Sequence, residues 1–166
     1  MVAIVAVGVI FLQDLFSENR DRQNKSLTYV TYATGAVGAL DLLLEWQKDL
    51  CERTRAPAGG QWRNWDFEIG FRITVLKVAL SNQIAEPALV EDLARVLAWL
   101  EQAQGLLTFT PPAALTSFQS GTDERAACAT RLRNMGKELL ESAASFQAPR
   151  NSGWRNLRRV IRRNRN

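Results

Sequence analysis

The sequence contains no histidine, and its 166 residues include only two cysteines, Cys51 and Cys128. Without imidazole, one chain cannot build a four-ligand Cys/His zinc site, a Ser-His-Asp or Cys-His catalytic centre, or a haem or copper site held by histidine. The two glycine-rich phosphate-binding fingerprints, GxxxxGK[ST] and GxGxxG, are also missing. We therefore expect a protein that is not an enzyme and that has no catalytic residues, no bound metal and no cofactor.

The two cysteines show no sign of a disulfide framework. They lie 77 positions apart and belong to no CxxC motif, and both adjoin apolar residues, since Cys51 follows Leu50 and Cys128 follows Ala127. Such cysteines behave as small hydrophobic side chains. We expect two reduced, buried thiols in a reducing compartment.

Long hydrophobic runs are scarce, and the longest run without a polar side chain covers residues 1–12. As a helix it would be about 18 Å long, shorter than the ~30 Å hydrocarbon core of a bilayer. No lysine or arginine precedes it and no small-x-small cleavage site follows, so a secretory signal fits poorly. Three interpretations are open: a membrane anchor, burial in a partner or homo-oligomer, or the protein's own core. The residues expected to contact a membrane or partner are Val5, Val9, Ile10, Phe11 and Leu12.

Basic charge is concentrated at the carboxyl end. Residues 150–166 contain seven arginines and no acid, whereas the other 149 residues carry 14 basic and 17 acidic side chains. Helical spacing of apolar residues predicts a short cationic amphipathic helix, which suits anionic lipid or the phosphates of nucleic acid. Packing on the acidic body or disorder is the alternative. The residues concerned are Arg150, Arg155, Arg158, Arg159, Arg162, Arg163 and Arg165 for phosphate, and Trp154, Leu157 and Ile161 for a membrane or partner.

The first part of the body, residues 27–54, has the periodicity of an amphipathic helix. Asp41 argues against a second membrane span here. A helix could run through the polar stretch 17–26 from the apolar start, or break there with Ser26 as a cap. The expected buried stripe is Val30, Ala33, Val37, Leu40 and Leu44, and a row of small residues suited to close helix packing, within the chain or in a dimer, is Thr31, Gly35 and Ala39.

Residues 62–83 fit two patterns. Apolar residues alternate from Trp65 to Val75 as in a strand, yet the same stretch fits a helix capped by Asn64. We favour the helix, because a lone strand has no partner to pair with. Trp62 and Trp65 are expected in the core or its edge, with an exposed aromatic contact surface as the alternative.

Two further helices are predicted. Pro87 opens one that ends near Gly105, with Glu91 and Asp92 in its first turn and both within reach of Arg95. A loop through Pro111 and Pro112 follows. Thr122 then caps a helix that ends before Pro149. Its expected apolar line is Cys128, Leu132, Met135, Leu139, Ala143 and Phe146.

Together these features predict an all-α protein: a bundle of four to five helices, preceded by a hydrophobic amino-terminal helix and followed by a basic amphipathic carboxyl-terminal helix. Residues 1–25 form the candidate anchor, 26–149 the bundle and 150–166 the arginine-rich tail. We expect an interaction or scaffold protein that is membrane-associated through its amino terminus and able to form homo-oligomers. Arg20, Arg22 and Lys25 follow the apolar run, so the body would lie in the cytoplasm. The alternative is a soluble helical module that binds nucleic acid through the tail.

Overall fold

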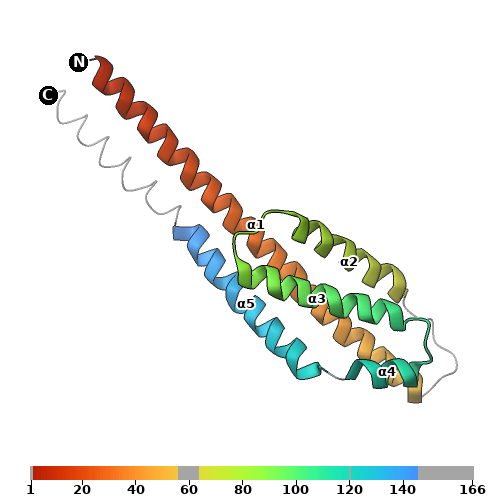
Figure 1. The fold of residues 1–166 in the computed structure, drawn as a ribbon. Coiled ribbons are helices and arrows are strands. Elements are labelled where there is room, and N and C mark those ends of the chain that lie inside the picture. Colours follow the sequence, from red (N-terminus) through yellow and green to blue (C-terminus); the bar gives the residue numbers. More distant parts are fainter. Residues whose placement is uncertain (1, 56–63, 120, 146–166) are drawn as a thin grey trace. The chain divides into compact units, whose positions relative to one another are not determined.

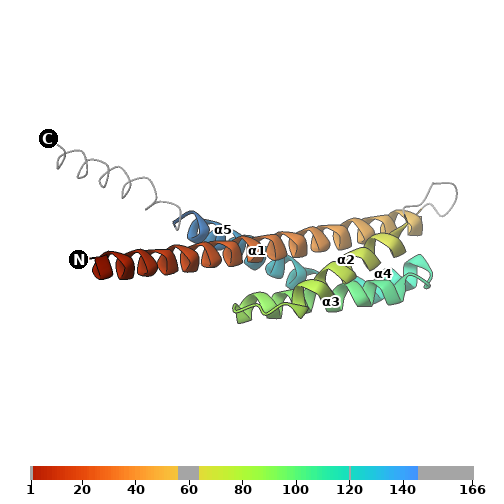
Figure 2. The same ribbon diagram turned by 90° about the horizontal axis from the view of Figure 1, so that it is seen from above.

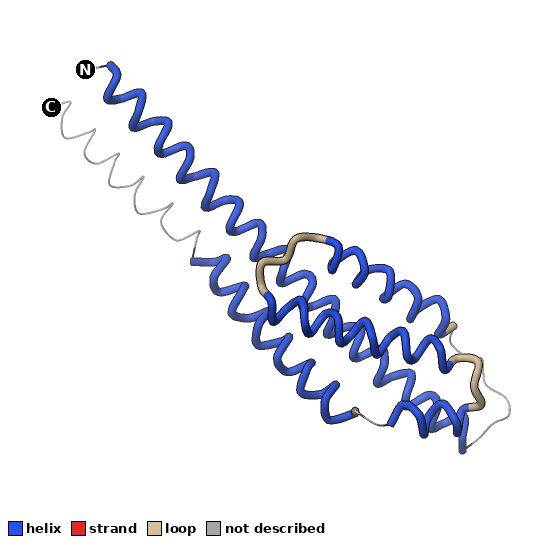
Figure 3. Tube along the Cα trace, in the orientation of Figure 1, coloured by secondary structure: helices blue, strands red, loops and turns tan. Residues whose placement is uncertain are grey.

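Every element in the described part of the chain is an α-helix, and no strand occurs there (Figures 1 and 3). The computed structural model describes residues 2–55, 64–119 and 121–145, without the side chains of residues 2–16 and 119. The all-α class predicted from the sequence is therefore confirmed. The helices are α1 (Val2–Arg55), α2 (Trp65–Ser81), α3 (Pro87–Leu106), α4 (Pro111–Gln119) and α5 (Thr122–Ser145).

The first helix, α1, continues through the polar stretch 17–26 without a break. The i,i+4 ion pair between Glu18 and Arg22 lies in this stretch and supports the helix. Ser26 is inside α1 and does not cap a new helix. By its internal contacts the chain divides into two units, Met1–Val30 with Lys137–Asn166 and Thr31–Gly136.

The unit Thr31–Gly136 has its core along one face of α1. The predicted stripe is wrong at three positions: Leu44 is exposed, and Val30 and Val37 are only half-buried. The helical period is correct, but the buried face is rotated toward the alanines and Trp46 because those residues carry the partner helices. The buried residues of α1 in this unit are Ala33, Ala36, Ala39, Leu40, Leu42, Leu43, Trp46 and Leu50.

The second helix, α2, confirms the helical interpretation of residues 62–83. The Asn64 side chain accepts a hydrogen bond from the backbone N–H of Phe67, which satisfies one orphan donor of the first turn. Trp65, Ile69 and Leu76 are buried, and α2 lies alongside α3, to which the chain returns after a short loop (Figures 1 and 2).

The fourth helix, α4, corrects the prediction of a loop after Pro111. Two consecutive prolines begin α4, where their missing N–H groups and fixed φ angle are tolerated. The first hydrogen bond runs from the Ala114 N–H to the Thr110 carbonyl at 3.0 Å, and Phe118 fills the core. Gly105 lies inside α3, which ends one residue later at Leu106.

Two adjacent leucines of α1 test the position of its buried face. Leu43 is 1% exposed and Leu44 is 44% exposed. We expect Leu43→Ala to lower the free energy of unfolding by about 2–5 kcal/mol, and Leu44→Ala by less than about 1 kcal/mol. Chemical denaturation followed by circular dichroism measures both. Equal losses would contradict this orientation of α1.

Candidate functional site

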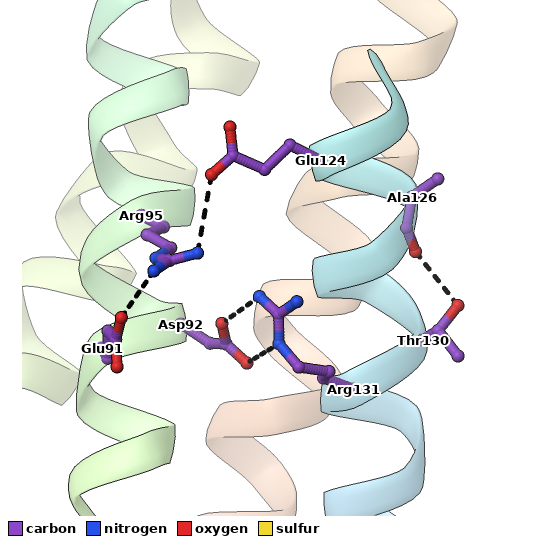
Figure 4. Close-up of polar contacts among 7 residues, drawn as sticks. All are labelled: Glu91, Asp92, Arg95, Glu124, Ala126, Thr130 and Arg131. Atoms are coloured by element: carbon purple, nitrogen blue, oxygen red, sulfur yellow. Dashed lines mark hydrogen bonds and ion pairs between the residues drawn. The ribbon is translucent and has the colours of Figure 1, made fainter. Parts of the chain in front are cut away.

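A buried carboxylate joins α3 to α5. Asp92 is 4% exposed, and its two oxygens accept hydrogen bonds from Arg131, from Nη2 at 2.6 Å and from Nε at 3.2 Å (Figure 4). This bidentate geometry is the strong form of an arginine–carboxylate pair. The hydrogen bond to Asp92 raises the pKa of the Arg131 guanidinium.

The sequence predicted that Asp92 lies within reach of Arg95 for an ion pair, and this prediction is wrong. Arg95 pairs with Glu91 on its own helix and with Glu124 of α5, where Nη1 and Oε1 are 3.5 Å apart (Figure 4). Successive residues of a helix point about 100° apart, so Glu91 faces solvent while Asp92 faces α5. The result is a second, exposed link between the same two helices.

Cys128 lies beside this ion pair and is fully buried. Burial raises the pKa of its thiol to about 12, and the negative charge of Asp92 and a hydrogen bond to it act in the same direction. Because the thiolate is the nucleophile and the metal ligand, this thiol is chemically inert near neutral pH. Cys51 is half-buried, and both cysteines are free thiols.

A second buried charge, Arg125, holds the junction between α4 and α5. Its Nη2 donates to the Phe118 carbonyl at 2.8 Å, and its guanidinium carbon lies 4.2 Å from the centroid of the Phe118 ring. A cation here also suits the negative end of the α4 dipole. Gly121 makes the turn between the helices with φ of 92°, a conformation that favours glycine. Burial lowers the pKa of Arg125. The sequence did not single out Arg125, because an arginine in the first turn of a helix gives no sign that it is buried.

These polar groups are arranged to hold helices together. Within the described residues, no group of three or more Asp, Glu, Cys or His side chains could bind a metal ion. Asp92 is already matched by Arg131, so the pair offers no open position to a ligand. No protein-family model, curated protein or solved structure matches this chain.

The residues proposed from sequence for binding fall mostly outside this site. The whole arginine-rich tail lies beyond the described residues. Val5, Val9, Ile10, Phe11 and Leu12 lie on the helical backbone of α1, in the part without described side chains. In the row of small residues, Thr31 is exposed, Gly35 half-buried and Ala39 buried. A Cβ at Gly35 would meet nothing within 4 Å, whereas one at Gly136 would lie 3.9 Å from Ala33.

Exposed apolar side chains gather instead on α2. Phe67, Phe71, Val75 and Val78 are 70%, 56%, 39% and 59% exposed, and their spacing places them on one side of the helix. We call these four residues the outward face of α2. Trp65, by contrast, is buried and donates from its indole nitrogen to Asp49, while Trp62 lies outside the described residues. The sequence already indicated this face, because α2 has more apolar residues than one buried helical stripe requires.

In the part of the chain with described side chains, one helix is long and apolar enough to cross a membrane. This helix is α1, and the stretch that meets the criteria lies in Ser17–Arg55. Of its most apolar window, 39% is buried inside the protein. Asp41 in this part of α1 pairs with Arg133 of α5 at 3.3 Å, and the Tyr32 hydroxyl accepts a hydrogen bond from the Asn82 amide. These contacts assign residues 31–55 to the body.

Removing each member of the ion pair should have unequal effects. Arg131→Ala leaves a buried carboxylate uncompensated and should lower the unfolding free energy by about 3 kcal/mol. Asp92→Ala leaves a half-exposed arginine in water and should cost less, and adding it to Arg131→Ala should recover stability. Urea denaturation of the four chains measures the coupling. The matched control is Arg133→Ala, which breaks the exposed pair with Asp41 and should cost at most about 1 kcal/mol. A double variant less stable than Arg131→Ala would contradict this account.

The two thiols should react differently with maleimide. In the Cys51→Ser chain, the remaining Cys128 should be labelled only after unfolding in urea, whereas the Cys128→Ser chain should be labelled in the native state. An unfolded thiol loses its proton near pH 9 but the folded one only near pH 12. The stability that Cys128 contributes is therefore present below pH 9 and is lost as the pH rises toward 12. Native labelling of Cys128 at pH 8 would show that the thiol is accessible.

Proposed function

We propose that this protein is a membrane-tethered interaction module, anchored by residues 2–16 of α1 with its helical body in the cytoplasm. The observation that carries this proposal is the continuity of α1, which extends from the apolar run into the core helix of the body with no linker. The body already satisfies its own core with residues 31–55. We therefore assign the apolar run that precedes these residues to a lipid environment.

The length of the run is compatible with a short span. Residues 2–16 form about 22 Å of helix, and a bilayer accommodates such a mismatch by local thinning and by snorkelling of flanking basic side chains. Arg20, Arg22 and Lys25 follow within three turns and supply those side chains. Their position on the carboxyl side of the run favours a cytoplasmic body.

The interaction role is supported by the surface of the body. Asp92 is paired with Arg131 and Arg125 donates to the Phe118 carbonyl, so these two buried charges link helices of the body. The outward face of α2 is apolar and exposed, which is typical of a surface that binds another protein. The proposal therefore separates an anchor at one end of α1 from a binding surface on the body.

A pair of substitutions in the apolar run tests the tether. Val5→Asp with Val9→Asp should abolish flotation with liposomes, because each carboxylate inside a bilayer costs about 3 kcal/mol. Ala98→Asp, at an exposed position of α3, is the control and should float like the natural sequence. Release of the unmodified full-length chain by carbonate would refute the tether.

The second candidate function is binding of nucleic acid through the tail, supported by its seven arginines and absence of acids. Such binding would be sequence-independent and would weaken steeply with salt. Deleting residues 150–166 distinguishes the two functions. If the deletion abolishes binding to a labelled duplex while flotation persists, the tail binds nucleic acid and the amino terminus is still the anchor.

A further inference from the structure

The outward face of α2 has the spacing of a helix-pairing seam. The residues Phe67, Phe71, Thr74 and Val78 follow one another at intervals of four, three and four residues. Val75 lies beside them on the helix. This is the spacing at which one helix packs against another along its length. All of these side chains are exposed, and Thr74 bonds only back to the Gly70 carbonyl of its own helix, among the contacts that the structure gives for it.

No charged side chain interrupts this seam, but charges flank it on both sides. On the side toward α3 lie Asp66, which contacts Gln104, and Lys77, which pairs with Glu101 at 2.8 Å. On the side toward α1 lies Arg72, whose guanidinium is near Gly38, with Glu68 one turn before it. Each flank is therefore acidic near the start of α2 and basic further along.

We propose that the outward face of α2 binds the outward face of α2 in a second copy of this chain, with the two helices antiparallel. A two-fold axis perpendicular to the helices places each flank of one copy opposite the same flank of the other copy, which runs in the reverse direction. Asp66 of one copy therefore approaches Lys77 of the other. The seam is self-complementary in the same register, with Phe67 opposite Val78 and Phe71 opposite Thr74. Parallel pairing would instead bring the flanks of opposite sides together, with Asp66 facing Glu68.

The charge pattern thus selects both the occupant and its direction. An acidic peptide or a nucleic acid would gain nothing from a seam without a basic residue. An isologous pair, by contrast, brings Asp66 of each copy to Lys77 of the other along the flank toward α3, and it closes at two copies. The interface is small, because α2 is about 26 Å long and one helix face per copy buries less than the ~1,200 Å² of a stable interface.

Tethering makes such a weak interface effective. Two copies held on one membrane meet at a far higher effective concentration than two copies free in solution. The extent of pairing inferred here rests on the proposed membrane tether. The antiparallel geometry of the pair does not depend on the tether. In solution the same pairing should appear only at high protein concentration.

Cross-linking of the full-length chain tests the geometry. A cysteine in place of Thr74 lies close to the two-fold axis, so Thr74→Cys should give a covalent dimer with a short bis-maleimide in vesicles. Gln102→Cys, at an exposed position of α3, is the control and should stay at the background set by the chain without an added cysteine. Equal dimer yields from the two positions would overturn the proposal.

Two matched substitutions in the Thr74→Cys chain test what holds the pair. Phe71 and Phe109 are 56% and 55% exposed, so Phe71→Ser should reduce the dimer yield at least tenfold while Phe109→Ser leaves it unchanged. Lys77→Glu should reduce it several-fold, and Lys48→Glu, at an exposed position of α1, should not. Circular dichroism confirms that each variant is folded.

The same chains separate this inference from the membrane proposal. If the chain fails to float but Thr74→Cys still cross-links at high concentration in solution, the tether is wrong and the α2 pairing stands. If Phe71→Ser abolishes flotation and leaves cross-linking unchanged, the outward face contacts lipid and the pairing is refuted.

Discussion

The body of this protein depends on the close approach that small residues allow along α1. Ala33, Ala36 and Ala39 are almost fully buried, and Gly136 of α5 lies next to Ala33. About two turns beyond Ala39, the small face gives way to Trp46, whose ring meets the Phe118 ring edge-on at a centroid distance of 4.8 Å. A helix surface that changes from alanine to tryptophan lets α5 approach α1 closely and leaves a wider gap that α4 fills. Helix α5 therefore meets α1 at its small residues, and α4 meets it at Trp46.

Polar contacts then fix which way each helix lies on that surface. Apolar packing alone tolerates rotation and sliding, whereas a bidentate ion pair has one geometry. The pair between Asp92 and Arg131 sets α3 against α5, and Arg125 fixes the junction of α4 and α5 by holding the Phe118 carbonyl. The raised pKa of Cys128 is a by-product, because the thiol is buried next to the Asp92 carboxylate. These groups link the helices to one another.

Helical periodicity was sufficient to predict the all-α class, the Asn64 cap and the helical state of α2. It could not predict α4, because a Pro-Pro pair starts a helix as readily as it forms a loop, and only the burial of Phe118 decides between them. The role of Asp92 was missed for a related reason. The sequence placed Asp92 in the first turn, but α3 starts at Pro87 and Asp92 lies in its second turn. A carboxylate near the start of a helix looks solvated until a distant arginine, 39 positions along the chain, is brought beside it. The buried face of α1 depended in the same way on neighbours that a single helix does not reveal.

The ambiguity of α2 between strand and helix has a physical origin that bears on function. A helix that buries one stripe and is polar elsewhere gives a clear helical period. In α2 the buried stripe of Trp65, Ile69 and Leu76 is matched by Phe67 and Phe71 on the opposite side, so apolar residues alternate as in a strand. The second stripe contributes nothing to the packing of the body, and it exposes apolar surface to water. A helix that is apolar on both sides is suited to packing on both sides, and the described residues of the body cover only one side of α2.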